Sequence, residues 1–510
     1  MKNKLIILFL FLTNILFSAN GSATYYRLKV GIHFDSNVSG GKYSLEELAS
    51  HIARTDLDAA ILTDHDNMKV SWGFEPFDKF VKYSIEESSV SKYGYKNYFS
   101  IINQLDKIYQ RVILIPGIEA VPFYHWQGSP MLKTLTLRDW HRHLLVFGMD
   151  DINDYKNLPS IPNGIGYKKT DLKNIVSYIT ENYIHFLILL VYFIIFIVAF
   201  LSIFRRRRIY NPLIEHRKRK KKVKFSIIAF IVAIIFGLIL KSEYPFLPTE
   251  YDQYHGDPGP GPYQNLIDYV NNNNGLVFYA HPEVRHHELR PVDIPYLKQT
   301  ISITTEAYPF LITQTKNHSG YAIFWEGMKV VGKPGGLWDM ALKEYCLGMR
   351  GKPIWAIGEL DFEESNDLKQ ITETNTFVFT KEKSKSGIFE AMKAGRMYAT
   401  RNYIGNVLTL EDFSVNDLMS RESAFIGETL KLTSSSPSIH IKMRLKPGNT
   451  SQSVLLFRND QLIERFRLRD VLDVWYEDRS YVSDNMYYYR IMVGETWQTL
   501  ATNPIFVNKN

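Results

Sequence analysis

The stretch from Lys29 to Asp66 constrains the fold more than any other part of the chain. A short apolar strand ends in His33-Phe34-Asp35, and after a glycine-containing turn and a run with helical spacing a second apolar strand, 59–62, leads into Thr63-Asp64-His65-Asp66. Two strands joined by a helix form a βα unit, and in barrels and open α/β sheets the chemistry lies at the C-terminal ends of the strands. Alternation along the first strand places His33 and Asp35 on one face, where both can reach one metal ion.

Four further apolar segments repeat this pattern of a strand that meets histidine or carboxylate residues. They are 111–120, which runs into Glu119; 141–149, which is entered through His143; 275–282, which closes on His281; and 353–362, which contains Glu359 and Asp361. A single histidine is more often structural than a ligand, and His51, His125, His141, His255, His286, His287 and His318 are placed in that class, although His286 and His287 could line a pocket. Several strand ends with metal-ligating residue types in one chain predict a shared metal site.

The order of these motifs resembles the PHP (polymerase and histidinol phosphatase) family, metal-dependent phosphoesterases on a distorted β/α barrel. The family has His-x-His on its first strand and Thr-Asp-His on its second, followed by strands of the type Gly-x-Glu, HLL-x-x-G and Ala-His-Pro, and this chain matches the last four. The segment 387–400 is similar to the helix that often closes the domain. The resemblance implies that the metal ligands are His33, Asp35, His65, Glu119, His143, His281, Glu359 and Asp361, with Glu119 as the bridging carboxylate.

The chain departs from the family pattern at three places. Asp35 stands where the family has histidine, Glu359-Leu360-Asp361 replaces Asp-x-His, and Ser39-Gly40-Gly41 lies where many members have another ligand. The first two changes retain oxygen donors and favour Mn²⁺, Fe²⁺ or Mg²⁺ relative to Zn²⁺. The third removes a ligand side chain, so two divalent ions are expected rather than three.

The function that the resemblance implies is hydrolysis of a phosphomonoester or phosphodiester in a phosphorylated small molecule or polymer. Asp64, His65 and Glu119 are the expected catalytic group, with Asp64 holding His65 in its ligating tautomer, and Arg285 and Arg396 are candidate contacts to the substrate phosphate. Two alternatives remain open at this stage. A degenerate barrel could bind a ligand without turning it over, as a binding or sensory module, and a cytoplasmic enzyme could act on nucleic acid.

Two apolar segments interrupt the motif series and predict a membrane hairpin over 184–241. The first, 186–204, contains 19 residues without a charge, about 28 Å as a helix, and the second, 225–240, is shorter but is flanked by lysines that can reach the headgroups. Spans are therefore expected at 184–204 and 225–241. Two buried core helices are the alternative, which an apolar surface all round each helix disfavours.

The basic loop between the spans, 205–224, determines the predicted orientation. It holds 11 lysines and arginines against the single acid Glu215, more than the net charge of +7 of the whole chain, so the remainder is mildly acidic. A basic connector belongs on the cytoplasmic side, which places the segments on either side of the hairpin together outside the cytoplasm. The charge is thus explained by topology, and no nucleic-acid partner is expected.

The ends of the chain complete the predicted organisation. Residues 1–23 have lysines, an apolar run and small residues in the order of a signal peptide, or of an uncleaved signal anchor, which predicts an inner-membrane protein with its main domains on the periplasmic or extracellular side. The barrel is expected over 24–183 and 242–404. From 405 to 510, period-two hydrophobicity predicts a small all-β, sandwich-like domain. The single cysteine, Cys346, excludes an intrachain disulfide and a cysteine-based metal cluster.

Overall fold

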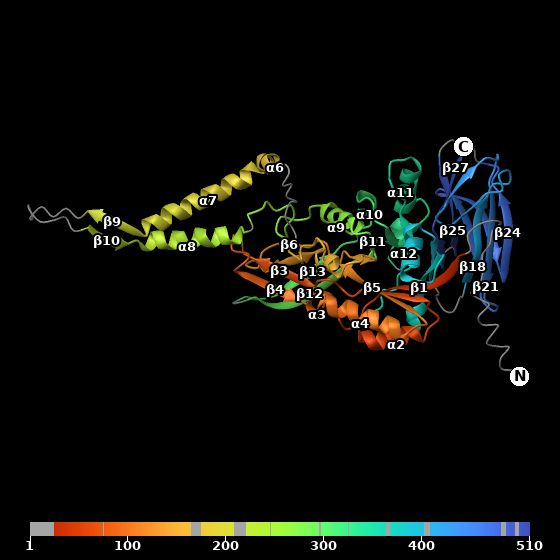
Figure 1. Cartoon of the computed structure of the whole chain (residues 1–510), viewed down its shortest axis with the longest axis horizontal. Coiled ribbons are helices and arrows are strands. Elements are labelled where there is room, and N and C mark those ends of the chain that lie inside the picture. Colours follow the sequence, from red (N-terminus) through yellow and green to blue (C-terminus); the bar gives the residue numbers. More distant parts are fainter. Residues whose placement is uncertain are drawn as a thin grey trace, which may run out of the picture.

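The computed structural model describes residues 25–509 except 75, 165–174, 209–220, 245, 295–296, 325, 364–367, 402–407, 481–485 and 495–498. The predicted signal segment, 1–23, and most of the basic loop lie outside the described residues. The chain is a mixed α/β protein with one large sheet, several smaller sheets and a projecting pair of apolar helices (Figure 1). The mixture of helices and strands expected from the sequence is therefore confirmed.

Seven strands of the largest sheet form the part that carries the sequence motifs. In their order across the sheet they are β15 (Trp355–Ile357), β14 (Gly320–Ala322), β11 (Leu276–Tyr279), β8 (Leu144–Phe147), β5 (Ile113–Ala120), β2 (Ala59–Leu62) and β1 (Tyr26–Phe34). Neighbours in this run are parallel except on both sides of β8. The chain that follows β15 returns to the end of β1, where the amide of Leu360 donates to the carbonyl of Ile32 and the amide of Phe362 to that of His33. These bonds join the two ends of the run.

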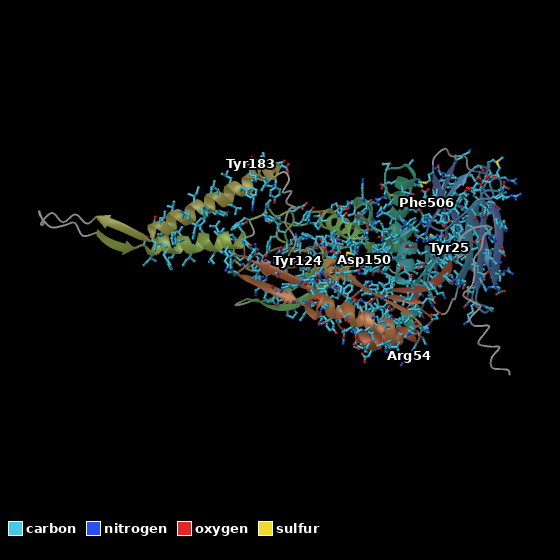
Figure 2. The ribbon with its side chains drawn as sticks, in the orientation of Figure 1. Tyr25, Arg54, Tyr124, Asp150, Tyr183 and Phe506 are labelled. Atoms are coloured by element: carbon cyan, nitrogen blue, oxygen red, sulfur yellow. The ribbon has the colours of Figure 1, made fainter. Side chains whose placement is uncertain are left out.

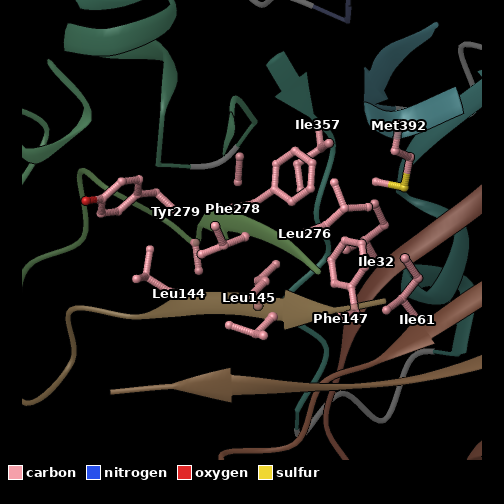
Figure 3. Close-up of a cluster of buried hydrophobic side chains, with 14 of the residues drawn as sticks. Ile32, Ile61, Leu144, Leu145, Phe147, Leu276, Phe278, Tyr279, Ile357 and Met392 are labelled. Carbon is pink, nitrogen blue, oxygen red and sulfur yellow. The ribbon is translucent and has the colours of Figure 1, made fainter. Parts of the chain in front are cut away.

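Helices pack outside these strands and bury their apolar stripes against them. They are α2 (Leu45–Ala53), α3 (Val90–Tyr93), α4 (Tyr95–Ile108), α5 (Ile152–Lys156), α9 (Gly261–Asn272), α10 (Leu311–Gln314), α11 (Leu337–Cys346) and α12 (Lys385–Lys393), with short irregular turns at Met328–Gly332 and Leu368–Thr372. Helix α2 begins at a capping box, in which Ser44 and Glu47 satisfy each other's backbone amides. The buried core between helices and strands includes Ile32, Ile61 and Phe147 (Figure 3).

The segment 387–400 is only partly the helix that the sequence predicts. Helix α12 ends at Lys393, and β17 (Met397–Arg401) follows after Gly395, whose φ of +72° places it in the left-handed region that glycine adopts most readily. Strand β17 pairs with β16 (Thr374–Thr380), which itself pairs with the first half of β1. The predicted helix was too long because its last residues have strand geometry.

The described residues from 408 to 509 form strands and the turns between them, with no helix among them. The strands are β18 (Leu408–Asn416), β19 (Ser423–Phe425), β20 (Thr429–Leu432), β21 (Ser438–Leu445), β22 (Gln452–Arg458), β23 (Gln461–Leu468), β24 (Val471–Glu477), β25 (Tyr487–Val493), β26 (Leu500–Thr502) and β27 (Ile505–Lys509). The sheet β19-β18-β21-β24 shares a buried core with strands β22, β25 and β27 of the large sheet, which β26 joins to β17. Arg490, fully buried on β25, forms an ion pair with Asp339 of α11 at 2.7 Å.

The projecting helices are α7 (Tyr183–Ser202), preceded by α6 (Ile175–Glu181), and α8 (Ile227–Ser242). The strands β9 (Phe204–Arg208) and β10 (Lys221–Phe225) form a two-stranded ribbon between them. Helices α7 and α8 project away from the rest of the chain, contact each other near this ribbon and separate towards α6 (Figure 1). Within the described residues one helix, α7, is long and apolar enough to cross a membrane by length and composition, with a mean hydropathy of 3.0 and 6% of its residues buried. Helix α8 is apolar but shorter, so the paired membrane spans at 184–204 and 225–241 stay a prediction.

Two smaller sheets flank the end of the large sheet that carries the motifs. One is the hairpin β3 (Lys69–Gly73) and β4 (Lys82–Glu86), and the other has the order β12 (His286–Ile294), β13 (Leu297–Thr305), β7 (Thr136–Arg138) and β6 (His125–Gln127). Strand β3 begins three residues after Asp66, so the first motif strands and this hairpin are directly connected.

Candidate metal centre

Glu119, at the end of β5, lies at the centre of a buried group of histidines. Its Oε1 atom is 2.7 Å from Nδ1 of His143 and 3.3 Å from Nε2 of both His33 and His281, and its Oε2 atom is 2.8 Å from Nδ1 of His65. These histidines lie at or just beyond the ends of β1, β2, β8 and β11, and the five side chains are at most 11% exposed. The structure thus brings together, around one carboxylate, strand ends that are separated by more than 200 residues of sequence.

A second group lies beside the first and is formed by His33, Asp35 and Asp361. Nε2 of His33 is 3.7 Å from Oδ2 of Asp35 and 3.5 Å from Oδ1 of Asp361. Within each of the groups His65–Glu119–His143 and His33–Asp35–Asp361, one ligand atom per residue lies within 4.8 Å of the others. The geometry therefore offers two adjacent positions for a metal ion.

The backbone at His33 and Asp361 is strained. Both residues have positive φ, +73° and +52°, and the register between β1 and β2 shifts at His33. Regular alternation along β1, which the sequence argument assumed, therefore does not place His33 and Asp35 together; an irregularity in the strand does. Positive φ in a residue other than glycine is uncommon and is found preferentially at functional sites.

Glu359 lies behind His33 rather than among the ligand atoms of either group. Its Oε2 atom is 3.0 Å from Nδ1 of His33, and its Oε1 atom accepts a hydrogen bond from the amide of His281 at 2.8 Å. Both oxygens are therefore used in orienting other residues. The geometry corrects the expectation that Glu359 is a direct ligand, because a carboxylate on Nδ1 leaves Nε2 of His33 for the ion.

Asp64 does not hold His65. Its carboxylate accepts hydrogen bonds from the amide and hydroxyl groups of Ser36 and Ser39, at 2.8–3.2 Å. The expectation that Asp64 fixes the tautomer of His65 is wrong because the carboxylate of Asp64, two residues beyond the end of β2, is bound to the turn after β1, whereas His65 faces Glu119. Its role is to hold that turn, which carries Asp35, in place.

The two arginines predicted to contact phosphate are not part of the buried group. Arg285 is 78% exposed and lies 4.0 Å from Glu306. Arg396 stacks over the ring of Tyr25 at 5.3 Å, and Tyr25 precedes β1, whose other end carries His33 about 26 Å along the strand. The interpretation of Arg396 as a substrate contact is therefore wrong, and Arg285 is outside the lining of the cavity described below.

Electrostatics in this group are dominated by burial and by Glu119. Burial lowers the pKa of each histidine, but the carboxylate of Glu119 outweighs burial at His65 and His281, whose pKa values are about 10 and 9. Burial wins at His143, where the pKa falls to about 4. Burial alone would raise the pKa of Glu119, yet His143 and His33 hold it well below its usual value. Ionised Glu119 is thus the counter-charge of the surrounding imidazoles.

Several ligand atoms in the two groups lack a hydrogen-bond partner although they are buried. They are Oδ2 of Asp35, together with Nε2 of His33 and Nδ1 of His65, which lie 3.3 and 2.8 Å from the Glu119 oxygens but without the geometry of a hydrogen bond. Burial also raises the pKa of Asp35 well above its usual value. Buried polar atoms in native proteins are almost always paired, with protein, water or an ion. Imidazole nitrogen and carboxylate oxygen that converge without partners fit a divalent cation.

An open cavity of about 560 Å³ adjoins the second group. It is lined by His281, Val284, Glu326, Glu359, Leu360, Asp361, Phe362, Glu363, Gln370 and Glu373. Five of these residues are acidic, and neither lysine nor arginine is among the described residues that line it. The cavity alone would repel an anionic ligand, so a phosphate could enter only with cations to neutralise the carboxylates.

The structure adds residues that the sequence analysis did not select. The hydroxyl of Tyr308 lies 3.4 Å from Nδ1 of His281 and accepts a hydrogen bond from the amide of His143 at 3.2 Å. Asp66 is buried, accepts hydrogen bonds from the Tyr95 hydroxyl and from Asn163, and has a pKa raised by burial to about 6. Asp66 belongs to the quoted Thr-Asp-His-Asp motif and could have been selected, whereas Tyr308 has no local sequence signal.

Two histidines that were treated as structural also border the group. The rings of His141 and His286 lie 3.9 Å apart, and the ring of His141 is 5.6 Å from that of His143. Burial lowers the pKa of His141 to about 2, so its imidazole is neutral at physiological pH. His286 lies beside His141 but is not among the residues that line the cavity next to the second group, and His287 is exposed and contacts Thr304, so the expectation that either lines the pocket stays a prediction.

Comparison with known proteins gives matches among solved structures. No protein-family model matches the chain, and no curated protein matches it either. Among solved structures, the chain is similar to a two-domain protein from Bacteroides vulgatus that contains a predicted PHP-like metal-dependent phosphoesterase, with 11% identity, coverage of 97% of this chain and 98% of that chain, and a TM-score of 0.35. It is also similar to a Bifidobacterium adolescentis protein whose name proposes a metal-dependent phosphoesterase, with 12% identity, coverage of 65% and 87%, and a TM-score of 0.24. TM-scores this low establish neither a shared fold nor a shared activity, so the function has to be inferred from the geometry of the site.

Proposed function

We propose that this chain is a metal-dependent phosphoesterase of the PHP type, built on a distorted β/α barrel. The observation that carries the proposal is the pair of adjacent ligand groups, His65–Glu119–His143 and His33–Asp35–Asp361, at the ends of neighbouring strands. The hydrogen bonds that join the chain after β15 to the end of β1 support the barrel. The same two groups support two ions, with Mn²⁺, Fe²⁺ or Mg²⁺ favoured over Zn²⁺ because oxygen donors are abundant.

The residues of the chain have distinct tasks in this proposal. Glu119 lies between the two groups and can contribute one carboxylate oxygen to each, as expected of a bridging ligand. Glu359 orients His33, and the carbonyl of Trp140, 3.2 Å from Nε2 of His143, leaves Nδ1 of His143 for the ion. When bound, divalent ions supply positive charge for the phosphoryl oxygens and acidify a water molecule.

The acidic cavity fits the place where the substrate would enter. Because the described lining offers no lysine or arginine, the affinity for a phosphoryl group depends on the ions alone. Glu326 and Glu363 line the same cavity, and burial raises the pKa of both carboxyl groups, so each can hold a proton more readily than a carboxyl in water. Either is placed to return a proton to the leaving group of an ester.

Anchoring in the cytoplasmic membrane, with the main domains outside the cytoplasm, is the second part of the proposal. It is supported by the length and hydropathy of α7, by the apolar composition of α8 and by the basic loop between them. A reporter enzyme that is active only outside the cytoplasm, fused after Asn510, tests the orientation. Activity is expected, and its absence would favour the cytoplasmic alternative.

The catalytic part is tested with the full chain, purified in detergent and supplied with Mn²⁺, on p-nitrophenyl phosphate and bis(p-nitrophenyl) phosphate. Hydrolysis of at least one ester is expected, with its loss on addition of EDTA. Glu119→Gln should lower kcat/KM by about 10²-fold or more because it removes the charge between the two groups. Glu411→Gln, in the C-terminal sheet, is the matched control and should behave like the natural chain. Hydrolysis that survives both EDTA and Glu119→Gln would contradict the proposal.

A second candidate function is a binding or sensory module that no longer turns over its ligand. The acidic cavity favours it, because five carboxylates beside a site in which Asp361 replaces the family's histidine could hold cations without chemistry. The variant Asp35→His with Asp361→His restores the ligand types of the family. If the natural chain binds metal but is inactive, and the double variant hydrolyses the same esters, this second function is the correct one.

A further inference from the structure

The turn between β3 and β4 exposes an unusual number of apolar side chains. Phe74, Phe80 and Val81 are 48%, 41% and 59% exposed, within a segment of eight residues. Single exposed apolar residues are normal on soluble proteins, but several together on one projecting turn mark a contact with another apolar phase or partner. The described residues of this turn, Phe74 and 76–81, together with Lys82, are called the β3–β4 tip below.

The β3–β4 tip is attached to the end of α8, where that helix meets the rest of the chain. Nζ of Lys79 donates to the carbonyl of Tyr244 at 2.7 Å, and the hydroxyl of Ser242 donates to Asp78 at 3.1 Å. The ammonium group of Lys241 lies 5.1 Å from the centre of the Phe80 ring. The tip therefore has a fixed position at one end of the apolar helix pair, which Figure 1 shows beside α8.

Other side chains at this end of the helix pair have the same character. Tyr183, at the start of α7, and Tyr244 and Phe246, just after α8, are 61%, 66% and 40% exposed. Helix α6, which leads into α7, exposes Ile175 and Val176 at 50% and 76%. Figure 2 shows the side chains of α7 and α8 standing free along the pair, with Tyr183 labelled at this end. Aromatic residues at the ends of apolar helices are typical of the membrane–water interface.

The exposed charges among the described residues at the tip are lysines. Lys79, Lys82 and Lys241 are exposed, whereas Asp78 is engaged by Ser242 and Glu243 is only partly exposed; Glu75, which the sequence places in the same turn, is a further acid. A lysine near a membrane surface that contains anionic lipids gains attraction to the headgroups, and its methylene stem can lie along apolar groups. Neighbouring phenylalanine, valine and lysine side chains are the combination found in segments that lie in the interface.

We propose that the β3–β4 tip is a third membrane contact, which inserts Phe74, Phe80 and Val81 at the boundary of headgroups and acyl chains and places its lysines on anionic phospholipid headgroups. This inference rests on the proposed anchoring of α7. It also has a consequence for the metal centre, because the chain runs from His65 through β3 to Phe74 in nine residues, at most about 30 Å. The tip thus holds the metal centre within that distance of the bilayer surface.

The test uses the full chain with Cys346→Ser, so that single cysteines can be labelled with an environment-sensitive fluorophore. Labels are placed by Phe80→Cys, by Val81→Cys as a second tip variant, by Ile194→Cys in the middle of α7, and by Leu418→Cys. Leu418 is 63% exposed in the turn between β18 and β19, and is the matched control for an exposed apolar turn residue. Each protein is reconstituted into phosphatidylcholine nanodiscs, with and without phosphatidylglycerol, and quenching by brominated lipids is measured.

The tip labels should be quenched at least about threefold more than the Leu418 label, most strongly by lipids brominated near the headgroup, and more with phosphatidylglycerol than without it. If the Ile194 label is quenched but the tip labels match the control, the inference is overturned while the anchor stands. If the Ile194 label is not quenched either, the anchor and the inference both fail. Equal quenching of the tip labels with and without phosphatidylglycerol overturns the part played by the lysines.

Discussion

The substitution Glu359→Gln tests whether Glu359 orients the metal ligand His33 or binds the ion itself. The carboxylate of Glu359 accepts one hydrogen bond from Nδ1–H of His33 and another from the backbone amide of His281. A glutamine side chain has only one oxygen, so it can accept one of these bonds and must present its NH₂ group to the other. If NH₂ faces His33, the imidazole proton moves to Nε2, the atom that faces the second ligand group.

The expected loss is about 10–100-fold in the affinity for Mn²⁺, which corresponds to about 1.4–2.8 kcal/mol. Affinity is measured on metal-stripped protein by competition with a fluorescent chelator. Glu326→Gln is the control, because Glu326 lines the same cavity but does not belong to either ligand group, and it should change the affinity by less than about threefold. Asp35→Ala, which removes a member of the second group, should cost more than Glu359→Gln.

Two results would refute this reasoning. An unchanged affinity in Glu359→Gln would mean that the orientation of His33 does not depend on the carboxylate. A loss as large as that of Asp35→Ala would mean that Glu359 is itself a ligand, as the sequence alone suggested.

Three other predictions concern charge and burial. In the absence of metal the pKa values of His65 and His281 are about 10 and 9 and the pKa of His33 is held well above its usual value by Glu119, so all three carry protons at pH 7. Because His33 and His65 belong to the two ligand groups, binding of Mn²⁺ should release about two protons per chain, measurable by calorimetry in buffers of different protonation enthalpy; no release would contradict the assignment. The same raised pKa values stabilise the metal-free folded state relative to the unfolded chain, in which the pKa of histidine is near 6.5. This stabilisation is fully present below pH 6.5 and is lost as the pH rises through 9 to 10. The melting temperature of metal-stripped protein should therefore fall between about pH 6.5 and 10. Asp339→Ala leaves the fully buried guanidinium of Arg490 unpaired and should lower the free energy of unfolding in urea by about 3–5 kcal/mol. The double variant Asp339→Leu with Arg490→Met should recover most of this loss. If the losses of the single variants add up in the double variant instead, the two side chains are not directly coupled.

Most of the strand ends that form the site could be predicted, because each apolar strand and its polar terminus are adjacent in the sequence. Glu119 lies near the end of a run of residues with strand propensity, His281 follows such a run and His143 precedes one. Parallel strands bring their C-terminal ends to one edge, and the antiparallel strand β8 brings its beginning to the same edge. What the sequence could not show is the direction of a side chain within a motif. Asp64 and His65 are neighbours in the sequence, yet one holds a turn and the other faces the centre.

Contacts between distant segments were also beyond local patterns. Glu359 has the residue type of a metal ligand, and only the position of His33 shows that its carboxylate contacts Nδ1 of that ligand instead of the ion. Arg396 lies in the turn between α12 and β17, where the sequence predicted that the helix continues, and its guanidinium group lies over the ring of Tyr25. The irregularity at His33, with its positive φ, has no signal in a stretch that otherwise reads as a regular strand.

The most direct test of the central claim is anomalous diffraction at the manganese edge from crystals of the chain grown with Mn²⁺. Two peaks are predicted, one among His65, Glu119 and His143 and the other among His33, Asp35 and Asp361, with Glu119 between them. Manganese bound only outside these two groups, or none at all, would contradict the account.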